Sequence, residues 1–107
     1  MPAKKISKTL INVINSYIQT LRADHLPIEH IFLFGSYAKG TSHRWSDVDL
    51  CVISTKFSDD IDAIQYLLSK RKLNPRFPIE PIGLHPENFK SNTALIREIK
   101  NTGIRII

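Results

Sequence analysis

The sequence has almost no cysteine and no long apolar run, and both absences restrict what the protein can be. Cys51 is the only cysteine among 107 residues, so no internal disulfide can form. Its place inside an apolar strand predicts a reduced, packed thiol rather than a nucleophile. The longest apolar stretches, HIFLFG and DLCVIS, are too short to cross a bilayer, and the N-terminus MPAKKISK lacks the apolar core of a signal peptide. We therefore expect a cytoplasmic protein with no membrane segment.

Length and charge set further limits. A chain of 107 residues with 42% hydrophobic residues has room for one core, so we expect a single domain over residues 1–107. The net charge of +5, from 15 Lys and Arg against 10 Asp and Glu, favours an anionic ligand or an acidic partner. Because the basic residues are dispersed and form no stripe with aromatic residues, direct nucleic-acid binding is the weaker interpretation.

The apolar spacing and the breaker residues predict alternating helices and strands. A stripe of three- and four-residue spacing from Ile6 to Leu21 predicts a helix over residues 5–23. A helix over 59–73 is expected to turn Ile61, Ile64, Leu67 and Leu68 inward, and one over 93–101 to end at a left-handed Gly103. Further segments are a turn or helix over 36–39, one helical turn near 85–89, and strands over 28–35, 47–54, 79–84 and 104–107. The pattern predicts an α/β (α+β) fold with a mixed sheet of three to four strands backed by helices, and Pro81 places its strand at an edge or bulge.

Two aspartates one residue apart lie at the start of the second predicted strand. Side chains alternate between faces along a strand, so Asp47 and Asp49 point the same way, about 6 to 7 Å apart. Two carboxylates side by side repel each other unless a cation or a shared proton offsets the repulsion. Mg²⁺ prefers such oxygen ligands, and Glu80 on the next strand is the natural third one. Two Mg²⁺ ions roughly 4 Å apart would then stabilise an attacking and a leaving oxygen.

The loop GSYAKG, between the first two predicted strands, supplies the complementary anion site. Gly35 has no side chain to obstruct a phosphate, and Ser36 offers a hydroxyl and a backbone N–H at a helix start. Lys39 and Arg44 on the same segment would compensate the charge of a triphosphate. The loop is not a P-loop, because Thr41 stands where that motif requires lysine.

Together these residues resemble a known family. The stretch GSYAKGTSHRWSDVDL looks like the signature of the DNA polymerase β-like nucleotidyltransferase superfamily, and it is most similar to the minimal nucleotidyltransferases of bacteria and archaea. The stretches IEPIGLHPENF and LIREIKNTGIRI resemble the tail of these small proteins. The resemblance implies that Gly35 and Ser36 contact phosphate, and that Asp47, Asp49 and Glu80 are the catalytic carboxylates and the ligands of a two-Mg²⁺ site. Two departures stand out: Glu80 replaces the aspartate of many relatives, and Tyr37 and Lys39 stand where arginines are common.

What the resemblance implies is transfer of a nucleoside monophosphate from ATP or another NTP, typically AMP from ATP, to a hydroxyl group, with pyrophosphate leaving. Minimal members are often encoded beside a helical HEPN-type protein and act as its antitoxin, so a HEPN-type partner is expected here, and an open pocket would be closed by this partner or by a homo-oligomer. The alternative is a noncatalytic antitoxin-like binding module that retains a relic nucleotide and metal pocket. Glu80 and the missing arginines favour this alternative.

Overall fold

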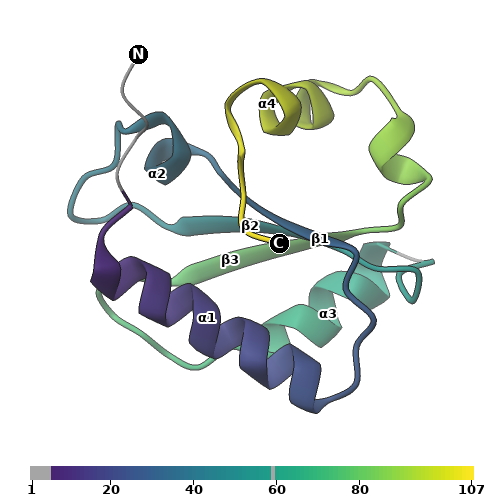
Figure 1. Ribbon diagram of the computed structural model, residues 1–107, viewed down its shortest axis with the longest axis horizontal. Coiled ribbons are helices and arrows are strands. Elements are labelled where there is room, and N and C mark those ends of the chain that lie inside the picture. Colours follow the sequence, from purple (N-terminus) through teal and green to yellow (C-terminus); the bar gives the residue numbers. More distant parts are fainter. Residues whose placement is uncertain (1–5, 59) are drawn as a thin grey trace.

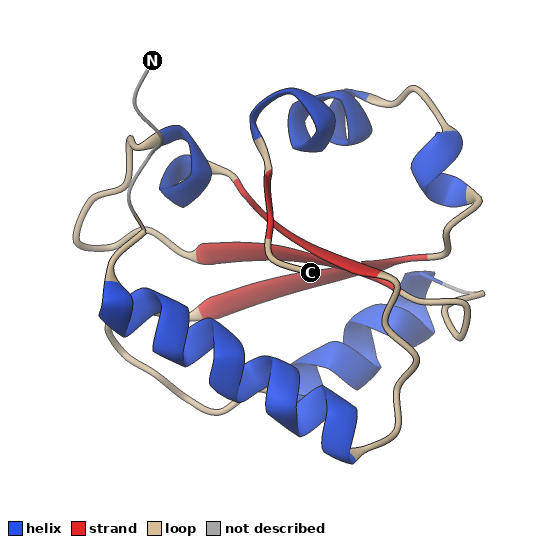
Figure 2. Cartoon of the chain, in the orientation of Figure 1, coloured by secondary structure: helices blue, strands red, loops and turns tan. Residues whose placement is uncertain are grey.

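The four strands of the protein form a single mixed sheet with helices on both faces (Figures 1 and 2). The computed structural model describes residues 6–58 and 60–107. The strand order is β3-β2-β1-β4, with β2 and β3 parallel and the other pairs antiparallel, which confirms the predicted mixed sheet. In chain order the elements are α1 (Lys8–Ala23), β1 (His30–Phe34), α2 (Ser36–Lys39), β2 (Val48–Ile53), α3 (Asp60–Lys70), β3 (Ile79–Leu84), the 3₁₀ helix η1 (Asn88–Lys90), α4 (Ala94–Thr102) and β4 (Ile104–Arg105).

The main core lies between the sheet and the pair of helices α1 and α3 (Figure 1). Leu21 of α1, Leu50 of β2 and Leu67 of α3 are completely buried there. Burying a leucine side chain contributes about 1.5–3 kcal/mol, so this layer supplies much of the stability of the fold. The Ser7 hydroxyl starts α1 by accepting a hydrogen bond from the backbone N–H of Leu10. None of the described helices is both long enough and apolar enough to span a bilayer.

The opposite face of the sheet carries a smaller core under α4 and η1. Cys51 and Ile53 of β2 pack there with Ile99 of α4, and Phe32 stacks on Phe89 of η1 with ring centroids 5.3 Å apart. Cys51 is completely buried, and this burial raises the pKa of its thiol to about 12. The prediction of a reduced, packed thiol is therefore confirmed.

Strand β3 lies at one edge of the sheet, as Pro81 predicted. Its parallel register with β2 pairs Asp49 with Glu80. Neighbouring strands are about 4.8 Å apart, so the register alone brings these two acidic side chains together on one face.

Helix α3 differs from its prediction at the end and on its surface. It ends at Lys70 rather than at residue 73, because the breaker residues Asn74 and Pro75 follow. Ile64 was expected to face inward, but it is 40% exposed, since α3 packs through the narrower stripe of Ala63 and Leu67. Leu68 is half-buried. The predicted helix start at residue 59, and the side chain of residue 61, lie outside what the structure describes.

The ends of α1 and α4 also correct the predictions. Helix α1 starts at Lys8, two residues after Ile6, and residue 5 lies outside the described residues. Gly103 is not left-handed, because its φ is −68° and its ψ is 152°. A glycine is needed there for a different reason: a Cβ at this position would lie 2.3 Å from the carbonyl oxygen of Ile99, which accepts a hydrogen bond from the Gly103 N–H.

Candidate functional site

The predicted site residues meet at one end of the sheet. Strand β1 ends there at Phe34, just before Gly35. The antiparallel strand β2 begins there after Asp47, and β3, which is parallel to β2, begins there with Glu80 as its second residue. Because Phe34 pairs with Asp49 and Asp49 pairs with Glu80, the three strand ends are held in one register by the ladder. The topology therefore gathers residues that are up to 45 positions apart in the sequence.

The tightest contact of the site joins Gly35 to Asp49. Gly35 has φ 75° and ψ −153°, a backbone conformation that is essentially restricted to glycine. A Cβ on Gly35 would lie 2.2 Å from Oδ2 of Asp49, so the carboxylate occupies the space that any other residue would fill. Glycine here thus satisfies the backbone geometry and admits the Asp49 side chain against the turn that leads into α2.

The electrostatics of Asp49 show that several carboxylates surround it. Burial, together with the negative charges of Asp47, Glu80 and Glu98, raises the pKa of the Asp49 carboxyl from 3.8 to about 6, and Lys39 opposes this only in part. Asp47 lies just before β2 and is exposed, whereas Asp49 is half-buried. We call Asp47, Asp49, Glu80 and Glu98 the carboxylate cluster.

Glu80 shares the cluster with a basic partner that sequence reasoning missed. Nη1 of Arg71 lies 3.8 Å from Oε1 of Glu80, and the same nitrogen donates a 2.8 Å hydrogen bond to the carbonyl oxygen of Ile79. The Glu80 side chain is 53% exposed, so this ion pair contributes little stability. The ion pair places the positive charge of Arg71 beside Glu80, the third predicted metal ligand.

Glu98 of α4 is the second residue that the sequence did not reveal. Its Oε2 lies 3.4 Å from Nζ of Lys39 in α2, and its charge acts on Asp49. The acidic residue stands beside Ile99, whose burial positions α4 on the sheet. No local motif marks Glu98, because only the packing of α4 brings it to the site. Lys39, predicted to bind phosphate, is therefore paired with a carboxylate in the structure.

Two of the other predicted phosphate ligands are available for a ligand. Ser36 begins α2, is half-buried, and its hydroxyl forms no hydrogen bond within the described part of the chain. Arg44 is exposed, and its guanidinium carbon lies 5.4 Å from the ring centroid of Trp45. Ser36 is next to Gly35 and the carboxylate cluster, whereas Arg44 lies on the loop that leads to Asp47.

The negative charge of the carboxylate cluster suits a divalent cation, but its side chains do not by themselves form a complete set of metal ligands. The neighbouring negative charges raise the pKa of Asp49, and a bound cation would offset their repulsion. Carboxylate oxygens are ligands that Mg²⁺ prefers. Over residues 6–58 and 60–107, however, no three His, Cys, Asp or Glu side chains converge closely enough to hold a metal ion. Mg²⁺ commonly uses one or two carboxylates and completes its shell with water and phosphate oxygens. The donor set of Asp47 and Asp49 is sufficient for this mode of binding.

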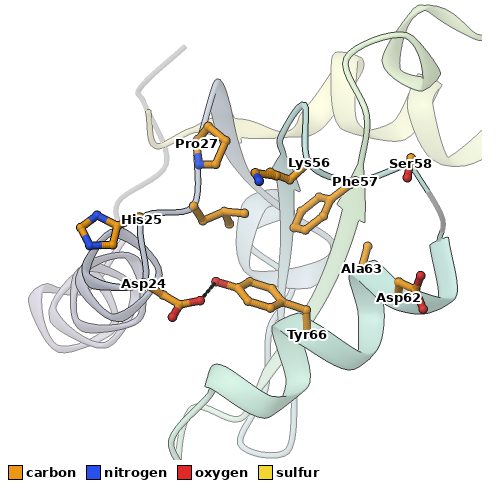
Figure 3. A pocket seen from close by; sticks show the side chains of 10 residues that line it. Asp24, His25, Pro27, Lys56, Phe57, Ser58, Asp62, Ala63 and Tyr66 are labelled. Atoms are coloured by element: carbon orange, nitrogen blue, oxygen red, sulfur yellow. Dashed lines mark hydrogen bonds between the residues drawn. The ribbon is translucent and has the colours of Figure 1, made fainter.

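A separate cavity of about 430 Å³ lies at the other end of the sheet (Figure 3). It is formed where α1 leads into β1 and where β2 leads into α3, and Figure 3 shows the hydrogen bond that the Tyr66 hydroxyl donates to Asp24. Asp24 also pairs with Lys70, with 3.3 Å between Oδ1 and Nζ. None of the predicted site residues lines this cavity, so we do not place the candidate site there.

Comparison with known proteins gives consistent matches. The chain matches the family described as "Nucleotidyltransferase domain" over residues 14–106. It is 46% identical over 48 residues to the protein adenylyltransferase MntA of Shewanella oneidensis, a match that covers 44% of this chain and about a third (34%) of that relative.

Crystal structures extend the similarity over most of the chain. A toxin–antitoxin with AMP-PNP is 27% identical with a TM-score of 0.59, covering 87% of this chain and 71% of that one. A variant of the toxin–antitoxin MntA–HpeT is 26% identical with a TM-score of 0.59, covering 88% and 71%. The predicted fold class is thus confirmed by solved relatives as well as by the topology.

Proposed function

The chain belongs to the nucleotidyltransferase domain family, and we propose that it is a Mg²⁺-dependent adenylyltransferase that moves AMP from ATP to a hydroxyl group on a partner protein, with pyrophosphate as the leaving group. The observation that carries the proposal is the contact of the Asp49 carboxylate with Gly35. The contact supports the proposal because a carboxylate suited to a metal ion lies against the glycine turn that we propose binds phosphate.

Each side chain of the site has a role in this proposal. Asp47 and Asp49 would hold the metal, and Glu80, which pairs with Arg71 in this structure, is the proposed third ligand. The backbone at Gly35 and the hydroxyl of Ser36 bind phosphate oxygens, while Lys39 and Arg44 offset the charge of the triphosphate. Bound Mg²⁺ would lower the pKa of the acceptor hydroxyl and neutralise the triphosphate. The protein groups mainly orient the two substrates and stabilise charge.

The proposed partner follows from the relatives. MntA is named a protein adenylyltransferase, and structures of the toxin–antitoxin MntA–HpeT resemble this chain. We propose that residues 1–107 act as a minimal nucleotidyltransferase domain and as an antitoxin, and that the acceptor is a HEPN-type protein in the cytoplasm. The structure with AMP-PNP supports ATP as the donor.

Transfer of label tests the proposal directly. The protein is incubated with Mg²⁺, ATP labelled at the α-phosphate and the product of the adjacent reading frame, and label on that protein is measured. Asp49→Ala is expected to reduce transfer by about 100-fold or more, because a proposed ligand of the Mg²⁺ ion is lost. Glu29→Ala is the matched control, since Glu29 is an exposed acid just before β1, at the other end of the sheet. Equal loss in both variants, or full activity in Asp49→Ala, contradicts the assignment.

A second candidate function is noncatalytic binding of the partner. The observation that favours it is the pairing of Glu80 with Arg71, together with the lack of a three-residue metal group in the described chain. In this case the adjacent gene product forms a complex with wild type and Asp49→Ala equally well, and no label is transferred. Complex formation and label transfer are therefore measured on the same samples.

A further inference from the structure

A basic pocket lies at the same end of the sheet as the carboxylate cluster, and of the predicted site residues only Arg44 lines it. It has a volume of about 730 Å³ and is lined by residues that include Tyr37, His43, Arg44, Trp45, Arg76 and Phe77. Trp45 lies two residues before Asp47, and Phe77 lies three residues before Glu80. The carbonyl of Pro78, next to Phe77, accepts a hydrogen bond from the N–H of Val48, which ties the two sides of the pocket to the start of β2.

The loop over residues 43–46 forms one wall of the pocket, and its hydrogen bonds leave Trp45 exposed to solvent. The N–H of Ser46 donates to the carbonyl of His43 at 3.0 Å, and the N–H of His43 donates to the Ser46 hydroxyl at 2.8 Å. The two bonds close a tight turn whose tip is Arg44 and Trp45. Ser46 is buried while Trp45 is 78% exposed, so the turn is anchored at its base and projects its aromatic residue.

The cations of the pocket are not neutralised. The guanidinium of Arg44 lies over Trp45 at 5.4 Å and that of Arg76 lies over Phe77 at 5.0 Å. Within residues 6–58 and 60–107 neither arginine forms an ion pair, and no acidic side chain lines the pocket. The arrangement is an electropositive patch with an apolar floor, made from the residue types that dominate binding at protein interfaces.

We propose that this basic pocket docks an acidic segment of the acceptor protein and so holds the acceptor at the end of the sheet where the carboxylate cluster lies. The inference rests on the proposed function and names the feature that the acceptor must carry. Because the side chains of Arg44 and Arg76 make the pocket positive, an acidic segment is the occupant whose charge complements it. A nucleic-acid strand fits less well, because Lys39 and Arg71, which would continue a basic track toward the carboxylates, are paired with Glu98 and Glu80.

Trp45 provides the measurement, because it is the only tryptophan in the chain. A random copolymer of glutamate and tyrosine serves as the probe, in EDTA and without ATP, with excitation at wavelengths that tyrosine does not absorb. We expect a saturable change in Trp45 emission. A single-stranded oligonucleotide without secondary structure is titrated in parallel, and tighter binding of the oligonucleotide than of the copolymer overturns the proposal.

Charge reversal at Arg76 locates the binding. Arg76→Glu is expected to weaken copolymer binding by about tenfold or more, and Arg76→Gln by a smaller factor. Arg22→Glu is the matched control, since Arg22 lies in the last turn of α1, at the other end of that helix from Ser7, which borders the pocket. An equal effect of Arg22→Glu overturns the proposal, because it shows attraction by net charge alone. Unchanged melting temperatures confirm that the variants fold.

The outcome is separable from that of the proposed function. Mg·ATP binding, measured by its effect on the melting temperature, is expected to be the same in Arg76→Glu as in wild type, while label transfer to the acceptor shows a raised KM for the acceptor and an unchanged kcat. Equal loss of Mg·ATP binding assigns the pocket to the nucleotide and overturns docking. Copolymer binding that depends on Arg76, without any label transfer, preserves the docking site and rejects the transferase.

Discussion

The contact between Gly35 and Asp49 predicts the cost of adding a single methyl group. Gly35→Ala forces alanine into a backbone conformation with φ 75° and ψ −153° and places its Cβ 2.2 Å from Oδ2 of Asp49. The backbone strain alone costs about 1–3 kcal/mol. For a domain of this size that corresponds to a decrease in Tm of about 4–12 °C. The carboxylate must also rotate away, so metal binding and transfer are expected to be lost.

The control for this prediction is Gly40→Ala. Gly40 has φ 76° and ψ 22°, the ordinary left-handed conformation, which alanine adopts at a lower cost than the conformation of Gly35. Its cost is expected to be about 1 kcal/mol, without loss of Mg²⁺ binding. Thermal unfolding followed by circular dichroism, with and without Mg²⁺, compares the two variants.

A double-mutant cycle separates strain from the clash. In the background of Asp49→Ala the carboxylate is absent, so Gly35→Ala should cost less by about 0.5–3 kcal/mol, whereas Gly40→Ala should cost the same in both backgrounds to within about 0.5 kcal/mol. If Gly35→Ala shows no coupling to Asp49, or is no more costly than Gly40→Ala, the two groups are not in contact and the reasoning about the site is refuted.

Three further predictions concern the charges. Because the pKa of Asp49 is raised to about 6, its ionisation destabilises the fold as the pH rises from about 4 to 6. Asp49→Asn should therefore raise the free energy of unfolding above pH 6 by roughly 1 kcal/mol, after solvent screening is allowed for, and should have no effect below pH 4. Thermal melts in EDTA at several pH values measure this difference. Glu98→Gln releases Lys39 from its ion pair and should lower the KM for ATP by about two- to fivefold in the transfer assay; an increase contradicts the prediction. The pKa of Asp24 is lowered by its hydrogen bond from Tyr66 and by Lys70, so Asp24→Asn should reduce Tm at pH 7 and have no effect once the pH falls below that lowered pKa.

Local sequence patterns predicted the elements and the central part of the site. The spacing of Asp47 and Asp49, the glycine before Ser36 and the proline in β3 each act within a few residues, and the structure has the strands and the turn where these signals place them. The position of Glu80 beside Asp49 also followed, on the condition that the second and third strands pair. Short-range sequence signals were sufficient to predict these features, because the residues concerned lie in turns and near the ends of strands.

Other features depended on packing and were not predictable from the sequence. Glu98 and Arg71 reach the site only because α4 and the segment after α3 pack where they do, and neither carries a local signal. Ile64 has the spacing of a core residue but is exposed, since periodicity gives the direction of the apolar face and not its width. Gly103 is where a helix end predicted it, but it is required by the nearby carbonyl of Ile99 and not by a left-handed backbone.

The distribution of charge along this end of the sheet links the site to its ligands. The carboxylate cluster holds four acidic groups, and within the described residues the ion pairs give it two cations, Lys39 on Glu98 and Arg71 on Glu80. The cluster is therefore negative within a chain whose net charge is +5, and one divalent cation would balance it. Arg44 and Arg76 of the basic pocket form no ion pair with any described acidic side chain. The Mg²⁺ ion of a metal-bound nucleotide and an acidic segment of the acceptor would thus each meet charge of the opposite sign, at the same end of the sheet.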